Sequence, residues 1–442
     1  MEKISKLFKF QERGTTFNTE LIAGLTTFMT MAYVLVLQPN AIVGFGVPEL
    51  IDVNGVLITK EAVLITTALV SGIITLFMAF YANLPFALSC GMGSNFMFGG
   101  MLQSGSISFG EIVGMTLVTG IIFVALSVFG IRDLIVRMIP KNIKTAISSC
   151  IGFFIAYLGL KSTGICDFSA GLAMGDFTQP TVLVSLFGLL LIATLTAYKV
   201  KGAMLIGIVA TTLICIPLGI TSLPDTIFDV PSFSAVTNVI GNINFSTIWT
   251  AEGVVLMFIA FFGDFFSTLG TVLGVASKAN MLDEDGNLPG IEKPFLVDAI
   301  GTCVGAICGC TTITTYVEST SGVEAGGRSG FASVVTGIMF IIMMFFAPLV
   351  LIIPDCATGP ALIFVGFLMI SGFKDIDFSD FTESFGPFVM IMFGTFMGSI
   401  AAGIAAGIIA HLFIKVITGK FSEIHIGMYI LAIPLILYFI YG

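Results

Sequence analysis

Three polar side chains stand inside apolar stretches of this 442-residue chain. Asp264 lies in FIAFFGDFFSTLGTV, Glu318 in TTYVESTSGV and Asn95 in GMGSNFMFGG. A charge at the middle of a bilayer costs about 2.5–3.5 kcal/mol on insertion scales, so such residues usually serve a function. Two carboxylates and an amide match a small planar ligand with ring N–H donors and carbonyl acceptors. Either carboxylate could also take up and release a proton during transport.

Structural roles are the alternative for these residues. Asp264 and Glu318 could cap broken helices or bind Ser and Thr hydroxyls, and Asn95 has the same alternative. Asp298, in KPFLVDAIGT, is interpreted as a structural residue near a membrane interface. Glu20 is also expected to mark an interface. The GGRSG run at 326–330 lacks the GK[ST] ending of a phosphate-binding loop and follows no strand, so we assign it no phosphate.

The composition says which kind of protein must position these side chains. Hydrophobic residues make up 56% of the chain and charged residues 10%, which excludes a soluble globular fold and a disordered chain. No basic patch indicates nucleic acid binding. With two histidines and no CxxC pair, neither an enzyme using histidine nor a metal site is supported. The eight cysteines are interpreted mainly as small apolar residues, with a redox role as the alternative.

Apolar segments long enough to span or half-span a bilayer follow one another along the chain. The third, 86–101, and the tenth, 313–323, are short, polar and rich in glycine. Paired broken segments in corresponding positions of two halves are the best sequence indication of a transporter binding site. The expected segments are 20–37, 62–81, 86–101, 111–130, 142–160, 181–198, 202–218, 252–276, 294–309, 313–323, 330–353, 357–373, 384–397 and 400–418.

This order predicts two units of seven segments in an inverted repeat. The first repeat is 1–218, the connection 219–250 lies outside, and the second repeat is 251–442. Basic residues gather on one side, which is therefore cytoplasmic together with the N-terminus. These residues are Lys3, Lys6, Lys9, Arg13, Arg132, Arg137, Lys141, Lys144, Lys199, Lys201, Lys415 and Lys420. The last apolar run, 425–441, is either an additional helix or a sign that the preceding segments are divided wrongly.

Several motifs resemble those of one family, the AzgA-like purine permeases, which belong with the nucleobase:cation symporters and nucleobase–ascorbate transporters. They are QERGTTFNTELIAGLTTFMTMAYVLVLQPNAI, GMGSN, FFGDFFSTLGTVLGVASKANMLDEDGNLPG, VDAIGT and TTYVESTSGVEAGGRSG. The resemblance runs from residue 10 to about 350 and more weakly to the end. It implies an all-α polytopic membrane protein of about fourteen transmembrane segments, with core and gate domains each built from both repeats. Segments 3 and 10 would each hold a short strand.

The resemblance also implies a function. The chain would import purine nucleobases (hypoxanthine, guanine or adenine) across the inner or plasma membrane by alternating access. The proton gradient would drive it without a cofactor, and a homodimer is the implied assembly. The substrate site would contain Gly93, Asn95, Phe96, Asp264, Thr268, Glu318 and Ser319, with Glu318 and Asp264 also coupling the proton. Phe265 and Phe266 are further candidates to stack on the purine, with core packing as the alternative.

The chain departs from the family pattern in the stretch GTFMGSIAAGI toward its end and at two places near the expected site. The family usually has a second Asp three residues after the first in the eighth segment, where this chain has Ser267. In the turn, Ser94, Phe96 and Met97 replace the usual Leu, Ala and Tyr. Another cargo (a pyrimidine, xanthine or a small anion) on the same fold is therefore the alternative. An intramembrane aspartyl protease is remote, because its GxGD motif needs Gly where residue 261 is Phe.

Overall fold

The computed structural model describes residues 2–129, 140–168, 173–283, 288–370, 373–374 and 376–441. This part of the chain is mostly helical, with three short two-stranded sheets. Eight of its helical stretches are long and apolar enough to cross a bilayer. They are Phe17–Val43, Lys60–Ala82, Phe109–Val128, Lys141–Ser162, Pro180–Ala197, Glu252–Lys278, Gly330–Leu351 and Ile400–Ile417.

The elements before residue 250 are α1 (Glu2–Leu7), α2 (Phe17–Met31), α3 (Val34–Val43), β1 (Glu49–Ile51), β2 (Leu57–Thr59), α4 (Lys60–Phe77), η1 (Met78–Ala82), β3 (Leu88–Cys90), α5 (Met92–Gln103), α6 (Phe109–Val128), α8 (Lys141–Ser162), β4 (Cys166–Asp167), β5 (Ala173–Met174), α9 (Pro180–Ala197), α10 (Ala203–Cys215), α11 (Phe233–Val236) and η2 (Thr247–Trp249). Those after it are α12 (Ala251–Lys278), α13 (Glu292–Ile307), β6 (Ile313–Thr315), α14 (Ser319–Glu324), α15 (Gly330–Met343), η3 (Met344–Phe346), α16 (Ala347–Leu351), α17 (Asp355–Ile370), α18 (Phe381–Phe396), α19 (Ile400–Ile417), η5 (Phe421–Glu423) and α20 (Ile426–Tyr441).

Polar caps fix where several of these apolar helices begin. Thr16 accepts a hydrogen bond from the backbone of Thr19 at the start of α2, and Thr250 accepts one from Gly253 at the start of α12. Ser108 and Glu111 form a capping box at the start of α6. Each cap satisfies backbone N–H groups that the first turn of a helix leaves unpaired. The helix boundaries therefore follow from local sequence as well as from the apolar runs.

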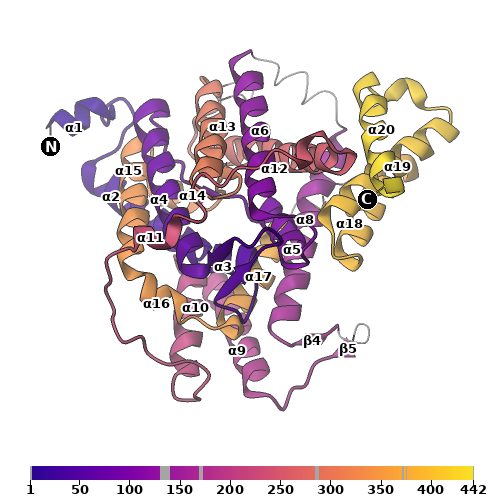
Figure 1. Cartoon of the computed structure of the whole chain (residues 1–442). Helices are drawn as coiled ribbons and strands as arrows, with labels where there is room; N and C mark the ends of the chain where they lie inside the picture. The colour runs from indigo at the N-terminus through magenta and orange to yellow at the C-terminus, as the bar shows by residue number, and fades with distance from the viewer. Residues whose placement is uncertain are drawn as a thin grey trace.

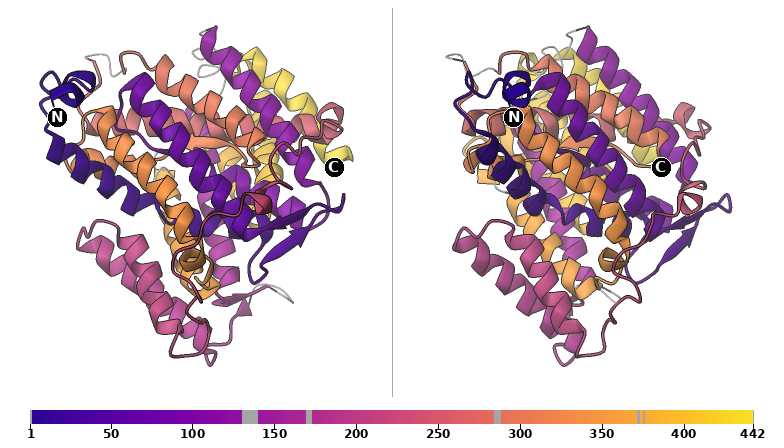
Figure 2. Two further views of the ribbon diagram at one scale, coloured as in Figure 1. Left: turned by 60° about the vertical axis from the view of Figure 1, so that its left-hand side comes forward. Right: turned by 90° about the vertical axis from the view of Figure 1, so that its left-hand side faces the viewer.

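The helices pack in two groups. In the first group α15 packs on α2 and α4, α6 on α13, and α3 on α5; in the second, α8 packs on α17 and α18, α17 on α9 and α10, and α18 on α19. Figure 1 shows α2, α4 and α15 at one side of the molecule and α18 to α20 at the other. In both views of Figure 2 the pair α9 and α10 protrudes from the rest. Helix α12 contacts members of both groups.

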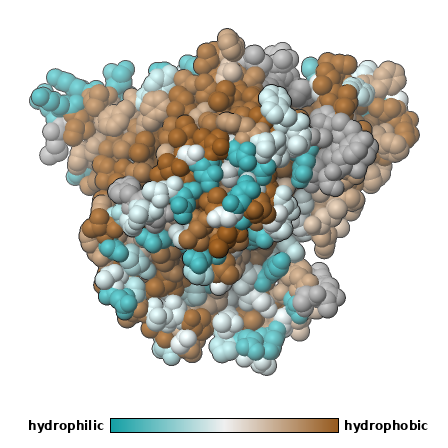
Figure 3. Space-filling view, viewed as in Figure 1, coloured by the Kyte–Doolittle hydropathy of each residue, from teal (hydrophilic) through white to brown (hydrophobic). Residues whose placement is uncertain are grey.

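Apolar side chains cover much of the outer surface. Leu190 is 66% exposed, Phe413 61% and Ile430 65%, and each of these side chains belongs to an apolar helix. In Figure 3 hydrophobic residues cover large parts of the visible face, while hydrophilic residues lie around α1 at the top left, across the middle and at the lower end. A soluble protein rarely exposes apolar patches of this extent. The chain is therefore a multi-pass membrane protein whose apolar surface faces lipid.

The start of α15 is held by a carboxylate from α2. Glu20 is fully buried, and its Oε1 accepts hydrogen bonds from the backbone N–H groups of Arg328 at 2.8 Å and Ser329 at 3.1 Å. Its Oε2 accepts a third from Ala332 at 3.1 Å. Anions bind well at helix N-termini because the N–H groups there are free. The Glu20 carboxylate thus accepts the free N–H groups of the GGRSG loop, where an external anion would otherwise bind, and it joins α2 to α15.

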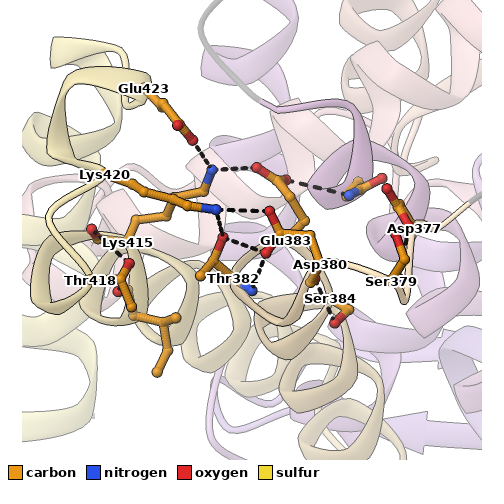
Figure 4. A network of polar contacts seen from close by, with 12 residues as sticks. Asp377, Ser379, Asp380, Thr382, Glu383, Ser384, Lys415, Thr418, Lys420 and Glu423 are labelled. Atoms are coloured by element: carbon orange, nitrogen blue, oxygen red, sulfur yellow. Dashed lines mark hydrogen bonds and ion pairs between the residues drawn. The ribbon is translucent and has the colours of Figure 1, made fainter.

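A second polar network lies at one end of α18 and α19 (Figure 4). The Lys415 ammonium binds Glu383 and Glu423, and the Lys420 Nζ atom lies 2.8 Å from Asp380 Oδ2. Asn142 at the start of α8 donates to Glu383 Oε2 at 3.3 Å. The hydrogen bond from Lys420 holds the pKa of the Asp380 carboxyl below its ordinary value. These contacts join α8, α18, α19 and η5 at that end of the second group.

Candidate functional site

Two short, buried strands from distant parts of the sequence pair with each other inside the molecule. Strand β3 pairs antiparallel with β6, so that Ser89 lies opposite Thr314. The pairing continues on both sides, because Gly91 N donates to Thr312 O at 2.8 Å and Tyr316 N donates to Ala87 O at 3.0 Å. Non-helical backbone at membrane depth needs such internal partners. Helices α5 and α14 begin directly after the two strands.

Glu318 stands at the start of α14 and is held by the first transmembrane stretch. Its side chain is half-buried, and Oε1 accepts a hydrogen bond of 2.6 Å from the Tyr33 hydroxyl. Tyr33 lies where the sequence predicts one continuous helix, but the structure breaks it there into α2 and α3. The next residue, Ser319, is fully buried and its hydroxyl accepts the backbone N–H of Ala87 at 3.0 Å. Ser319 therefore joins α14 to the residue before β3.

Asp264 lies on α12, the helix that packs beside strand β6. It is 7% exposed, and its Oδ2 atom has no hydrogen-bond partner among the described residues. The Thr302 and Thr314 hydroxyls lie within hydrogen-bonding reach of this carboxylate. Helix α12 also contacts α14, β6 and α5. An unpaired buried carboxylate oxygen is unusual, because desolvation without a hydrogen bond is costly.

Thr268 connects this carboxylate region to Asp298. The Thr268 hydroxyl donates to Asp298 Oδ2 at 2.9 Å and lies 2.9 Å from the Thr314 hydroxyl. Asp298 is fully buried and also accepts a hydrogen bond of 3.1 Å from the Thr315 hydroxyl. It lies close enough to Asp264 for the two acids to interact electrostatically. Asp298 thus joins α13 to α12 and β6, next to the candidate site.

The amide of Asn95 is occupied by protein groups. Its Nδ2 donates to Gln38 Oε1 at 2.7 Å, and its Oδ1 accepts from the Thr311 hydroxyl. Gly93 lies against α8, since an added Cβ would come within 2.8 Å of Ile151 Cγ2. Phe96 is 3% exposed. A ligand could contact Asn95 only by replacing one of its two present partners.

The two phenylalanines after Asp264 differ in their surroundings. Phe265 is 1% exposed and packs its ring on Phe123 and Phe295. Phe266 is 9% exposed, and the Lys144 Nζ atom lies 5.4 Å from its ring centroid. Phe265 therefore belongs to an aromatic core. Phe266 lies where α8 of the second group approaches α12.

Ser267 differs from these groups, which are buried. It is exposed, and it shares one face of α12 with Gly263, Gly270 and Gly274. A Cβ added at any of these three glycines would meet no atom within 4 Å. Most other helical glycines of the described part lie in close contact with a neighbour. This face of α12 is therefore unpacked among the residues that the structure describes.

The structure thus brings Asp264 and Thr268 together with β6, and Glu318 and Ser319 together with α2, α3 and β3. Residues that the sequence did not connect with the site also contact its members, among them Tyr33, Gln38 and Asp298. Each is a polar side chain within an apolar stretch, the signal that identified the others. Among the described residues, no group of three or more His, Cys, Asp or Glu side chains could hold a metal ion.

Comparison with sequence families gives one match that covers most of the chain. The model described as Permease family matches residues 18–408. Curated relatives match over nearly their whole length. The adenine permease AdeQ of Escherichia coli is 35% identical over 97% of this chain and 94% of its own. The guanine/hypoxanthine permease PbuG of Bacillus subtilis is 36% identical over 98% of this chain and 99% of its own.

Solved structures share the fold at low sequence identity. The transmembrane domain of the cyanobacterial bicarbonate transporter BicA matches with a TM-score of 0.58 at 14% identity, covering 88% of this chain and 97% of that one. The murine anion transporter Slc26a9 in its inward-facing state matches with a TM-score of 0.63 at 13% identity, covering 94% of this chain and 72% of that one. These likenesses show a transporter fold and leave the cargo open.

Proposed function

The chain belongs to the permease family, and from that premise we propose that it is a proton-coupled secondary transporter that imports purine nucleobases. The observation that carries the proposal is the full-length match to relatives named adenine and guanine/hypoxanthine permeases. The family consists of transporters, so the chain is not an enzyme and the protease alternative is excluded. Hypoxanthine, guanine and adenine are the proposed cargoes.

The proposed architecture is fourteen transmembrane segments in two inverted repeats of seven. Residues 1–218 form the first repeat, 219–250 the external connection and 251–442 the second. The first helical group would be the core domain and the second the gate domain, with α12 at their boundary. Movement of one group against the other would open the site to each side in turn. The N-terminus would be cytoplasmic and the assembly a homodimer.

Within the site, Glu318 and Asp264 would accept hydrogen bonds from the purine ring N–H groups. The half-buried Glu318 is the more accessible of the two, and Tyr33 keeps one of its oxygens in place. Asp264 offers the unpartnered Oδ2 as an acceptor. One of these acids would carry the proton. When the proton binds to the carboxylate oxygen, that oxygen can no longer accept the hydrogen bond from the purine N–H, and the substrate would be released. Each carboxylate thus links cargo and proton through the same atoms.

The remaining residues would complete the pocket around the purine. Asn95 would contact the opposite edge of the ring by exchanging Gln38 for substrate, and Gly93 would let α5 lie close against Ile151 of α8 at this edge of the pocket. Phe96 would contribute apolar surface. Thr268 and Ser319 would act through their neighbours, since their hydroxyls are bonded to Asp298 and to the Ala87 backbone.

A second cargo class on the same fold is the main alternative. A relative of Schizosaccharomyces pombe, 30% identical over 91% of this chain, is named as a xanthine/uracil permease, and the fold neighbours are anion transporters. Two acids in the site disfavour a small anion, because like charges repel. Xanthine and uracil carry ring N–H groups and carbonyls, so the geometry accommodates them as well.

The test is uptake of radiolabelled hypoxanthine, guanine, adenine, xanthine and uracil into cells that lack their own permeases. A protonophore and Na⁺-free medium separate the two driving ions. We expect saturable purine uptake that the protonophore abolishes and that Na⁺ removal leaves unchanged. Uptake of uracil alone, or purine uptake that persists with the protonophore, contradicts the proposal.

Glu318→Gln removes the proposed acceptor with little change in volume. We expect at least a tenfold loss of purine uptake at equal abundance in the membrane, because the lost partner is a charged hydrogen bond worth about 1.5–3 kcal/mol. Glu324→Gln, at the other end of α14, is the matched control and should keep wild-type uptake. Full uptake by Glu318→Gln would remove Glu318 from the site.

A further inference from the structure

Two cysteine side chains from distant parts of the sequence meet at one end of the second helical group. Cys215 is the last residue of α10 and Cys356 the second residue of α17. Their Sγ atoms lie 3.3 Å apart, and the side chains are 0% and 5% exposed. Together with Val184 they form a small apolar cluster separate from the main core. We propose that Cys215 and Cys356 are a disulfide-forming pair that links α10 to α17.

The backbone on both sides of the pair is already fixed. The chain turns back after Cys215 at Gly219, which has a φ of +69°, and Ile220 N donates to Cys215 O at 3.0 Å. The Thr221 hydroxyl then donates to Ile352 O at 2.7 Å, just before α17. The turn after one cysteine is thus bonded to the segment before the other.

Helix α9 holds the second cysteine from the other side. The Ser185 hydroxyl donates to the carbonyl oxygen of Cys356 at 3.1 Å. A disulfide requires the two sulfurs to approach from 3.3 Å to about 2.05 Å. The contacts described above hold the backbone on both sides, so rotation of the two side chains is the expected route to this approach.

A cavity gives small reagents access to one member of the pair. Cys356 lines a cavity of about 820 Å³ together with Pro354, Asp355 and Ile220. Volumes of this order hold small organic molecules. Cys215 does not line this cavity. Cys356 is therefore the sulfur that an external oxidant meets first.

The oxidation proceeds by thiol–disulfide exchange with a disulfide of low molecular weight. The Cys356 sulfur, once deprotonated, attacks the oxidant, forms a mixed disulfide and releases one small thiol. The Cys215 sulfur then attacks Cys356 Sγ and releases the second small thiol. Two protein thiols lose two electrons and two protons, and the oxidant becomes two thiols. Because both sulfurs are buried in apolar surroundings, we expect a stable structural bond rather than rapid cycling.

The cysteine pair lies at the end of α10 from which the chain continues into residues 219–250. Residues 219–250 contain no Lys or Arg. The positive-inside rule therefore places this end outside the cytoplasm. Disulfides persist in such oxidising surroundings and are rare in the cytoplasm. The location and the sulfur geometry support the same inference independently.

The test uses the whole protein purified in detergent, incubated with oxidised glutathione or with dithiothreitol. After denaturation without reductant, a maleimide polymer counts the free thiols, and mass spectrometry of the digest identifies linked peptides. The reduced protein should show all eight thiols and the oxidised protein two fewer, with a linked peptide that joins Cys215 to Cys356. Eight reactive thiols after oxidation, or a link that joins a different pair alone, overturns the proposal.

Two variants sharpen the test. Cys166 lines the same cavity but is not bonded to either sulfur, so Cys166→Ser should still lose two thiols on oxidation. Cys215→Ser should form no linked peptide, and Cys356 should stop at the mixed disulfide with glutathione, so that a single thiol is lost. Retention of the cross-linked peptide mass with Cys166→Ser supports the assignment, and its disappearance contradicts it. The digest of wild-type protein decides the question even if Cys215→Ser fails to fold.

Discussion

The Tyr33 hydroxyl donates a hydrogen bond of 2.6 Å to Glu318 Oε1 and so joins the start of α3 to the start of α14. The two residues are 285 positions apart, and one comes from each proposed repeat. Tyr33 is 2% exposed, so its own hydroxyl would be unsatisfied without this acceptor. The pair fixes one carboxylate oxygen of Glu318. If Glu318 binds the cargo as proposed, Tyr33 is a positioning residue for it.

Tyr33→Phe removes this donor and keeps the ring. Because a hydrogen bond to a charged group contributes about 1.5–3 kcal/mol, we expect the KM for purine uptake to rise by roughly tenfold or more. The maximal rate per transporter should change less, since Glu318 itself remains. Initial uptake rates over a range of purine concentrations, normalised to membrane abundance, measure both quantities.

Tyr157→Phe is the matched control for this substitution. Its ring stacks on Phe154 in α8, away from Glu318. Loss of its hydroxyl should leave KM unchanged. Equal KM values for Tyr33→Phe and wild type would show that the hydrogen bond does not position the substrate-binding carboxylate.

Ser267→Asp introduces the carboxylate that the related family usually carries at this position. Ser267 is exposed on the unpacked face of α12, so the larger side chain should fit without loss of folded protein. If this face borders the substrate path, an added acceptor should favour guanine, which has more N–H donors than hypoxanthine. We expect the guanine-to-hypoxanthine uptake ratio to rise about 3–10-fold. An unchanged ratio with normal abundance places residue 267 outside the path.

Glu20→Ala removes the carboxylate that receives three backbone N–H groups at the start of α15. These donors would lose their partner in a buried place, so we expect a loss of about 3 kcal/mol in the free energy of unfolding. A lowered melting temperature in detergent is the measurement. Glu12→Gln alters an exposed ion pair with Lys9 and should leave the melting temperature nearly unchanged.

Acid should weaken the α18 to η5 network through Asp380. Lys420 and Thr382 lower the pKa of Asp380 in the folded protein. A lowered folded-state pKa contributes stability that is present above the unfolded value of about 3.9 and is lost as the pH falls below it. The difference in melting temperature between wild type and Asp380→Asn should therefore be constant from pH 7 to about 5 and shrink near pH 4. A difference that is independent of pH down to 3 contradicts this account.

Part of this molecule is predictable from sequence because burial of charge is costly everywhere in a bilayer. That rule, extended to polar side chains, identified Asp264, Glu318 and Asn95, and the structure places α12 in contact with both α14 and α5. The same rule applies to Asp298, whose full burial was not predicted because a nearby Lys293 suggested an interface. The roles of these residues in binding remain predictions that the uptake experiments test.

Other features could not be predicted because they depend on partners far away in the sequence. The break at Tyr33 lies in a run that the sequence predicts as one helix, and the Tyr33 hydroxyl there binds Glu318 from the other half of the chain. Asn95 was expected to face a ligand, but Gln38 and Thr311 already occupy its amide. No local pattern distinguishes an amide bound to protein from one that faces a ligand.

The β3–β6 pairing also sets the order of events during synthesis. Its two strands are more than 220 residues apart, so the first strand exists long before its partner does. Protein synthesis proceeds at about 5–20 residues per second, so the backbone of β3 stays without its partner strand for roughly 10–45 s. During that time the translocation machinery or water must satisfy those groups. The newly made first half therefore depends on assistance that the finished protein no longer needs.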